Sequence, residues 1–126
     1  ILLIADVRLY GELGIQWDLN ATVWGRPVVG MATDDIRTLL DTRPNPRARV
    51  ACVGFGDLGW AAICAAATDD RITRAIAPDL KHAHLSDQGS TTLPNVLRYG
   101  SPPELVGLCG PDRIAPAPDG WVAALI

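Results

Sequence analysis

The stretch that decides the fold is residues 50–67, which read VACVGFGDLGWAAICAAA. Together with Arg49, its first four residues form a short apolar run of the kind that predicts a buried strand, Arg49–Val53. The glycines at 54, 56 and 59 then mark a tight turn. From Asp57 to Ala67 the alanine-rich segment is apolar on nearly every side, which predicts a buried helix. The stretch therefore predicts a strand, a glycine turn and a helix in direct succession.

Working outward, three further apolar runs predict strands, and they lie at Ile1–Val7, Thr73–Ala77 and Arg113–Ala117. From Pro27 to Leu40 the apolar residues recur at helical spacing, with Asp34, Asp35 and Arg37 on the opposite face. Strands that alternate with helices are typical of a parallel sheet with right-handed crossovers. We expect a three-layer α/β/α architecture with a parallel sheet, formed by residues 1–126 as a single domain.

Composition narrows the class of function. Eleven Lys and Arg face fourteen Asp and Glu, a net charge of -3, and no basic run is present. This balance argues against nucleic acid and anionic membranes as partners, and no apolar stretch approaches the ~20 residues of a spanning helix. Three cysteines without a zinc-binding spacing, and a His82–His84 pair without accompanying ligands, predict no metal site. We expect no cofactor.

The apolar beginning, Ile1-Leu2-Leu3-Ile4, reads as the middle of a strand. We therefore expect the chain to be part of a longer polypeptide. Exposed sheet edges would then favour self-association or pairing with the missing parts of the parent chain.

Two kinds of site use a strand, a glycine turn and a helix. In a dinucleotide-binding turn, GxGxxG lets a pyrophosphate approach the helix N-terminus, and Asp79 after the next strand would bind the ribose. The carboxylate of Asp57 would repel that phosphate, and it is instead suited to cap the helix. In a nucleophile elbow, GxSxG holds a serine on a strained turn. Here the serine position is Gly56.

Five segments in order resemble the acetyl xylan esterase and dienelactone hydrolase-like branch of the α/β-hydrolases. They are DVRLYGE (6–12), GRPVVGM (25–31), RVACVG (49–54), AAATDDRI (65–72) and LPNVLRYG (93–100). The resemblance implies a partial α/β-hydrolase-like fold with a carboxylic ester hydrolase ancestry, acting on a small-molecule or carbohydrate ester if it is active. Arg8, in the first of these segments, is expected to support the turn by hydrogen bonds.

By the same resemblance, Gly56 occupies the nucleophile position and the backbone N–H of Asp57 an oxyanion-donor position. The acid position falls on Asp119, with Asp112 as the alternative alignment, and the family's histidine comes later than residue 126. Because glycine has no hydroxyl, we expect a catalytically degenerate hydrolase-like domain. Two alternatives stay open: an ester hydrolase active only within a longer parent protein, and a GxGxxG nucleotide-binding domain. The four tryptophans are expected to serve packing rather than a carbohydrate platform.

Overall fold

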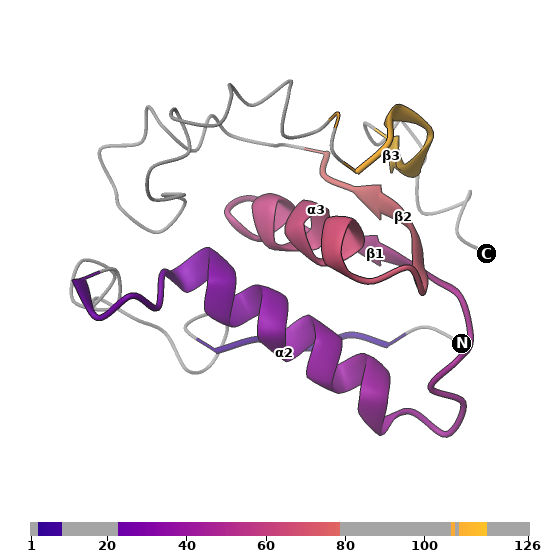
Figure 1. The fold of residues 1–126 in the computed structure, drawn as a ribbon, viewed down its shortest axis with the longest axis horizontal. Helices are drawn as coiled ribbons and strands as arrows, with labels where there is room; N and C mark the ends of the chain where they lie inside the picture. The colour runs from indigo at the N-terminus through magenta and orange to yellow at the C-terminus, as the bar shows by residue number, and fades with distance from the viewer. Residues whose placement is uncertain (1–2, 9–22, 79–106, 108, 116–126) are drawn as a thin grey trace.

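A computed structural model describes residues 3–8, 23–78, 107 and 109–115 of the chain (Figure 1). Two helices, α2 (Val28–Thr42) and α3 (Leu58–Thr68), accompany three strands, β1 (Val50–Val53), β2 (Ile72–Ile76) and β3 (Ile114–Ala115). A short 3-10 turn, η4 (Pro111–Arg113), leads into β3. The strands form one parallel sheet in the order β1-β2-β3, so the described part belongs to the mixed α/β class.

The β1–α3–β2 unit is the centre of the fold. Cys52 pairs with Ala75 and Val53 with Ile76 in parallel register. Backbone hydrogen bonds close the unit at both ends, from Val50 N–H to the Arg71 carbonyl and from Gly54 N–H to the Ile76 carbonyl, each at 2.9 Å. Parallel neighbours require a crossover, and α3 supplies it while covering β1 and β2 (Figure 1). The carboxyl ends of β1 and β2 thus lie side by side.

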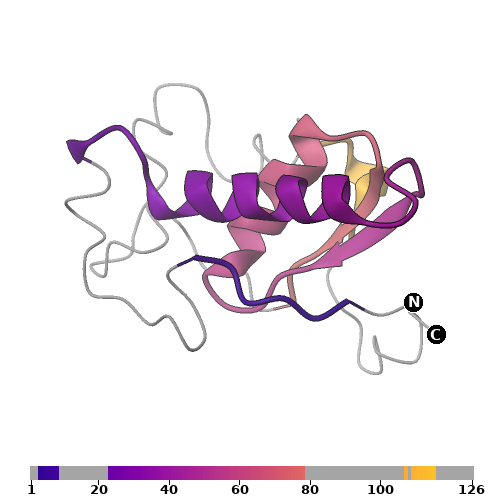
Figure 2. The same cartoon turned by 90° about the horizontal axis from the view of Figure 1, so that it is seen from below.

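Packing between α2 and α3 depends on small residues. Ala32 of α2 and Ala61 and Ala65 of α3 are fully buried, and the short side chains let the two helices lie against each other (Figure 2). The buried hydroxyl of Thr33 donates a 2.8 Å hydrogen bond to the Val29 carbonyl of its own helix. With alanine on most of its faces, α3 gains its stability from this burial rather than from one amphipathic stripe.

Two arginines fasten the end of α3 to its surroundings. Arg71 binds Asp69 with two nitrogens, at 2.9 Å for Nε to Oδ1 and 2.6 Å for Nη2 to Oδ2. Arg113 donates from Nη2 to the Ala66 carbonyl at 2.7 Å and to the Ile72 carbonyl at 2.5 Å. The Ala66 carbonyl lies in the last turn of α3, where helical partners are lacking, and Ile72 begins β2. The Arg113 guanidinium therefore satisfies the helix end and ties the residue before β3 to the α3–β2 corner.

Most of the expected elements are confirmed where the structure describes them. The strands expected at 49–53, 73–77 and 113–117 correspond to β1, β2 and β3, although residues 116–117 of the last lie outside the described part. The helices expected from residues 27 and 57 correspond to α2 and α3.

The expected first strand is wrong over residues 3–7, which have no strand assignment. Its apolar composition fits burial, yet only Val7 is buried and Ile4 is 84% exposed. A strand needs a hydrogen-bonded neighbour, and none of the described residues supplies one. In the described part, the helices α2 and α3 pack against each other, and α3 covers the sheet (Figures 1 and 2).

Candidate functional site

The turn between β1 and α3 lies at the carboxyl edge of the parallel sheet. Its first residue, Gly54, donates its backbone N–H to Ile76, the last residue of β2. The turn then closes on itself, as Leu58 N–H donates to the Phe55 carbonyl at 3.0 Å and Gly59 N–H to the Gly56 carbonyl at 3.2 Å. Ligands of open α/β sheets bind outside this edge, which makes the turn the leading candidate site.

Gly54 is required by a close approach of backbone to backbone. A Cβ atom at this position would lie 2.2 Å from the Leu58 carbonyl oxygen and 2.9 Å from the Gly59 nitrogen. These atoms belong to the first turn of α3 and cannot move aside as a side-chain tip can. The tight strand-to-helix connection therefore depends on the missing side chain.

Gly56 stands in a different situation. Its φ is +54°, in the left-handed region, but a Cβ built there meets no atom within 4 Å. Glycine is favoured here by its backbone conformation, while the place of a Cβ is open. A Cβ at position 56 would fit at the cost of backbone strain.

Asp57 occupies the N-cap position of α3, but the expected capping hydrogen bond is not formed. Its backbone is already helical, with φ -65° and ψ -25°, and its side chain makes no cap bond to the helix. Side-chain capping normally accompanies an extended N-cap backbone, which this turn does not have. The carboxylate still lies at the helix N-terminus, where its negative charge opposes a phosphate.

The two candidate acid positions fall differently. Asp112 is exposed in η4, immediately before β3. Since the strands are parallel, the residues before β3 lie toward the amino edge of the sheet, away from the turn that follows β1. The neighbouring Arg113 reaches Ile72, the first residue of β2, which fixes the same edge. Asp112 is therefore not placed to serve the turn, and Asp119 lies outside the described residues, as does Asp79.

Arg8 supports α2 rather than the turn. Its Nε donates to Asp35 Oδ1 at 2.8 Å, its Nη2 lies 2.6 Å from the same oxygen, and its backbone N–H donates to Oδ2. Burial by itself would raise the pKa of Asp35, but these hydrogen bonds outweigh it and the pKa is lowered. The expectation that Arg8 buttresses the turn is wrong. The pair instead fastens residues 3–8 to α2.

The three cysteines are poor nucleophiles in this environment. Burial raises the pKa of the Cys52 and Cys64 thiols to about 11, and it also raises that of Cys109. Cys109 Sγ donates to the Ile63 carbonyl at 3.1 Å. Thiols with raised pKa values stay protonated near neutral pH, so none of the three replaces a serine nucleophile.

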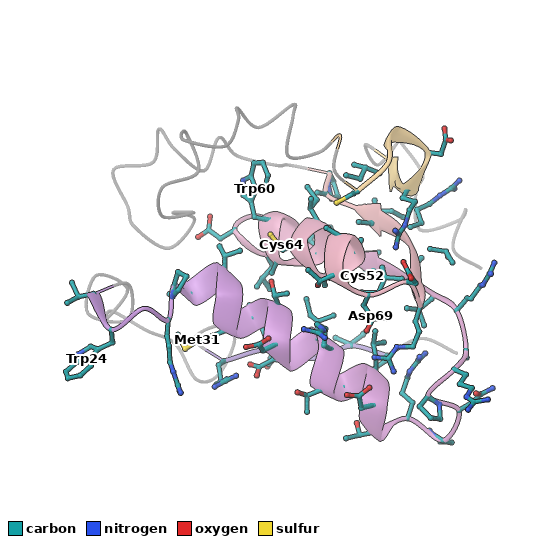
Figure 3. The ribbon with its side chains drawn as sticks, in the orientation of Figure 1. Trp24, Met31, Cys52, Trp60, Cys64 and Asp69 are labelled. Atoms are coloured by element: carbon teal, nitrogen blue, oxygen red, sulfur yellow. The ribbon has the colours of Figure 1, made fainter. Side chains whose placement is uncertain are left out.

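Tryptophans and metal ligands add little to the site. Trp60 is 1% exposed and lies on the side of α3 away from α2 (Figure 3), as expected of a packing residue, whereas Trp24 is 84% exposed, contrary to that expectation. Trp17, Trp121 and the His82–His84 pair lie outside the described residues. No group of three or more His, Cys, Asp or Glu side chains gathers within the described ranges. Among these residues, no helix has the length and apolar character to cross a membrane.

An apolar groove of about 180 Å³ begins beside the turn, and sequence reasoning did not find it. Gly54 and Leu58 line its end, and it continues between residues 3–7 and the outer edge of β1, against Leu39 of α2. No sequence signal marks it, because residues 1–5 are apolar without interruption and only the structure shows that Leu3, Ala5 and Val7 line the groove.

No family model, no curated protein and no solved structure matches the chain.

Proposed function

We propose that the chain is a catalytically degenerate α/β-hydrolase-like domain, with Gly56 at the position of the absent nucleophile and a three-layer architecture when complete. The observation that carries the proposal is the conformation of Gly56. It combines a left-handed backbone, open space for a side chain and a place at the carboxyl edge of a parallel sheet. A nucleophile elbow needs all three, because the serine oxygen must stand on a strained turn above the sheet.

Gly54 supports the same proposal independently. In an elbow the residues flanking the serine are small because strand and helix come too close for side chains. The 2.2 Å approach of a Cβ at Gly54 to the Leu58 carbonyl oxygen is a crowding of this kind. A dinucleotide turn would also require glycine there, but it would leave the Asp57 carboxylate facing a pyrophosphate. The elbow is therefore the better account of the turn.

Without a hydroxyl at position 56, the domain lacks the group that would attack an ester carbonyl. The neighbouring backbone N–H of Asp57 would remain as an oxyanion donor, and Asp119 as the acid position. Oxyanion binding without a nucleophile accelerates hydrolysis by only about 10³–10⁴ over water. We propose binding of a small-molecule or carbohydrate ester, or a structural role within a longer protein, rather than turnover.

The experiment uses the chain and two single-hydroxyl variants with a fluorophosphonate probe. The unmodified chain is expected to remain unlabelled and to release no burst of p-nitrophenol from p-nitrophenyl acetate, because no acyl-enzyme can form. Labelling of the unmodified chain, or a burst of p-nitrophenol, would favour an active ester hydrolase and overturn the proposal. Neither Gly56 nor the described thiols supplies an attacking group at neutral pH.

Gly56→Ser tests whether the position is an elbow. The Cβ of the new serine enters open space, and by the resemblance the family's histidine comes later than residue 126. We therefore expect labelling at residue 56 to exceed that of an ordinary serine only by what the Asp57 N–H contributes as an oxyanion donor. Phe55→Ser is the matched control, because it places the same hydroxyl one residue earlier, at an exposed side chain in the same turn. Equal labelling of the two variants would show that position 56 has no special orientation.

A further inference from the structure

The outer edge of β1 is open in the described part of the chain. Val50 and Gly54 direct their backbone N–H groups toward β2, to the Arg71 and Ile76 carbonyls. Because backbone groups alternate along a strand, those of Ala51 and Val53 face the other side. No described residue pairs with that side, and Ala51 is exposed. β1 therefore presents two outward N–H and two outward carbonyl groups to a neighbour.

The apolar groove runs along this edge and has the form of a place for one strand. Leu3, Ala5 and Val7 form the wall opposite β1, and Ile36 and Leu39 of α2 form the floor. The alternation of the wall residues shows an extended backbone with one side turned to the groove. Figure 1 shows the 3–8 segment passing behind α2, beyond the edge of β1.

The shape and charge of the groove select its occupant. A second copy that approached by its own β1 edge would bring β2 behind that strand, whereas the far side of the groove is bounded by Leu3, Ala5 and Val7. This boundary favours a single strand with two free edges. Among the described lining residues only Arg43 is charged, and its guanidinium already donates to the Leu40 and Ala48 carbonyls. The complementary strand therefore has uncharged apolar side chains at alternate positions, facing α2.

We propose that this groove binds an extended, uncharged segment of another polypeptide, which adds to the sheet beside β1. The outward backbone groups of Ala51 and Val53 supply the hydrogen bonds, and the groove receives one or two apolar side chains. The proposal concerns the edge of β1 and is independent of the chemistry at Gly56.

The test titrates the isotopically labelled 126-residue chain with a capped pentapeptide of alternating valine and threonine. We expect saturable binding, with the amides of Ala51 and Val53 shifted and protected from exchange, and those of Val50 and Cys52 little changed. The same peptide with N-methylated central residues cannot donate to β1 and is expected to bind at least about tenfold more weakly. Equal affinity of the two peptides, or no saturable binding, would overturn the proposal.

Variants of the protein test the same contact from the other side. Ala51→Pro removes one outward N–H at an edge position where proline is tolerated, and we expect about tenfold weaker binding than for Ala51→Val, which keeps it. Ala5→Phe, at an exposed residue of the wall, fills the groove without entering the sheet and should abolish binding. The Ala5→Phe variant tests the proposal even if Ala51→Pro does not fold.

Amide exchange in the chain without peptide distinguishes the possible occupants of the groove. In the monomeric chain without peptide, we expect the Ala51 and Val53 amides to exchange rapidly. Protection that is independent of concentration would mean that this chain's own residues fill the groove. Protection that rises with concentration, together with dimer formation, would mean that a second copy fills it. Either result would overturn the proposal.

Discussion

Replacing Gly54 by alanine should be the most damaging methyl addition among the described glycines outside the helices. The new Cβ would stand 2.2 Å from the Leu58 carbonyl oxygen, whereas ordinary contact begins at 3.4 Å, so the two must separate by 3.4 - 2.2 = 1.2 Å. The obstacle is backbone at the start of α3, which is held by the Leu58 N–H bond to Phe55 and by burial of the helix. Overpacking costs about 1–3 kcal/mol where side chains can adjust, and we expect the upper end or more here.

Thermal and urea unfolding of the 126-residue chain provide the measurement. With an unfolding entropy of about 2.1 cal/mol/K per residue, a loss of about 3 kcal/mol lowers Tm by roughly 11 °C. The midpoint in urea should fall while the slope stays the same, because one added methyl group barely changes the surface exposed on unfolding.

Two matched alanine variants separate crowding from backbone strain. Gly56→Ala adds the methyl in open space but at a φ of +54°, and should cost about 1–2 kcal/mol. Gly107→Ala adds it in open space at an exposed residue and should change stability by no more than about 0.5 kcal/mol. If Gly54→Ala were as mild as Gly107→Ala, the close packing of strand and helix at this turn would be refuted.

Three further predictions concern other contacts. Arg71 donates hydrogen bonds that lower the pKa of Asp69 from 3.8 to about 2. The folded state therefore gains stability that is present above pH 4 and is lost as the pH falls toward 2. In Asp69→Asn, the urea midpoint should depend less on pH over that range than in the unmodified chain. Arg113→Met leaves the Ala66 and Ile72 carbonyls without their guanidinium donor and should lower the free energy of unfolding in urea by about 2 kcal/mol. A variant as stable as the unmodified chain would show that these two hydrogen bonds do not stabilise the fold. Burial raises the pKa of the Cys52 and Cys64 thiols to about 11, from an ordinary value of 9.0. Iodoacetamide at pH 8 should therefore alkylate both thiols roughly 100-fold more slowly in the folded chain than in urea. Equal alkylation rates by mass spectrometry would exclude the raised pKa.

The β1–α3–β2 centre was predictable from sequence because its signals are local. The alanine run of α3 and the apolar runs on either side of it need no knowledge of distant residues. The same holds for α2, whose periodic face begins at Pro27 and whose end at Thr42 precedes Arg43, an extended residue before Pro44.

The sequence-based predictions that the structure does not bear out have a common physical origin. Each concerns a feature that is set by the neighbours of a residue rather than by its type. Residues 3–7 have the composition of a strand, but pairing requires a neighbour that the described residues do not supply. Alignment alone favours Asp119 over Asp112, and the direction of β3 is what separates Asp112 from the turn. Asp57 has the residue type of a cap, but the helical backbone inherited from the glycine turn keeps its side chain from capping.

Closure of the β1–α3–β2 unit at both ends has a consequence for folding order. All of its closing contacts lie within residues 50–76, so the chain entropy lost in forming them is small compared with that of joining β3 across the intervening residues. We therefore expect this unit to form first during folding, with α2 and β3 docking afterwards. Destabilising changes at Ala61 or Ala75 should therefore slow refolding, whereas the loss of Arg113 should mainly accelerate unfolding.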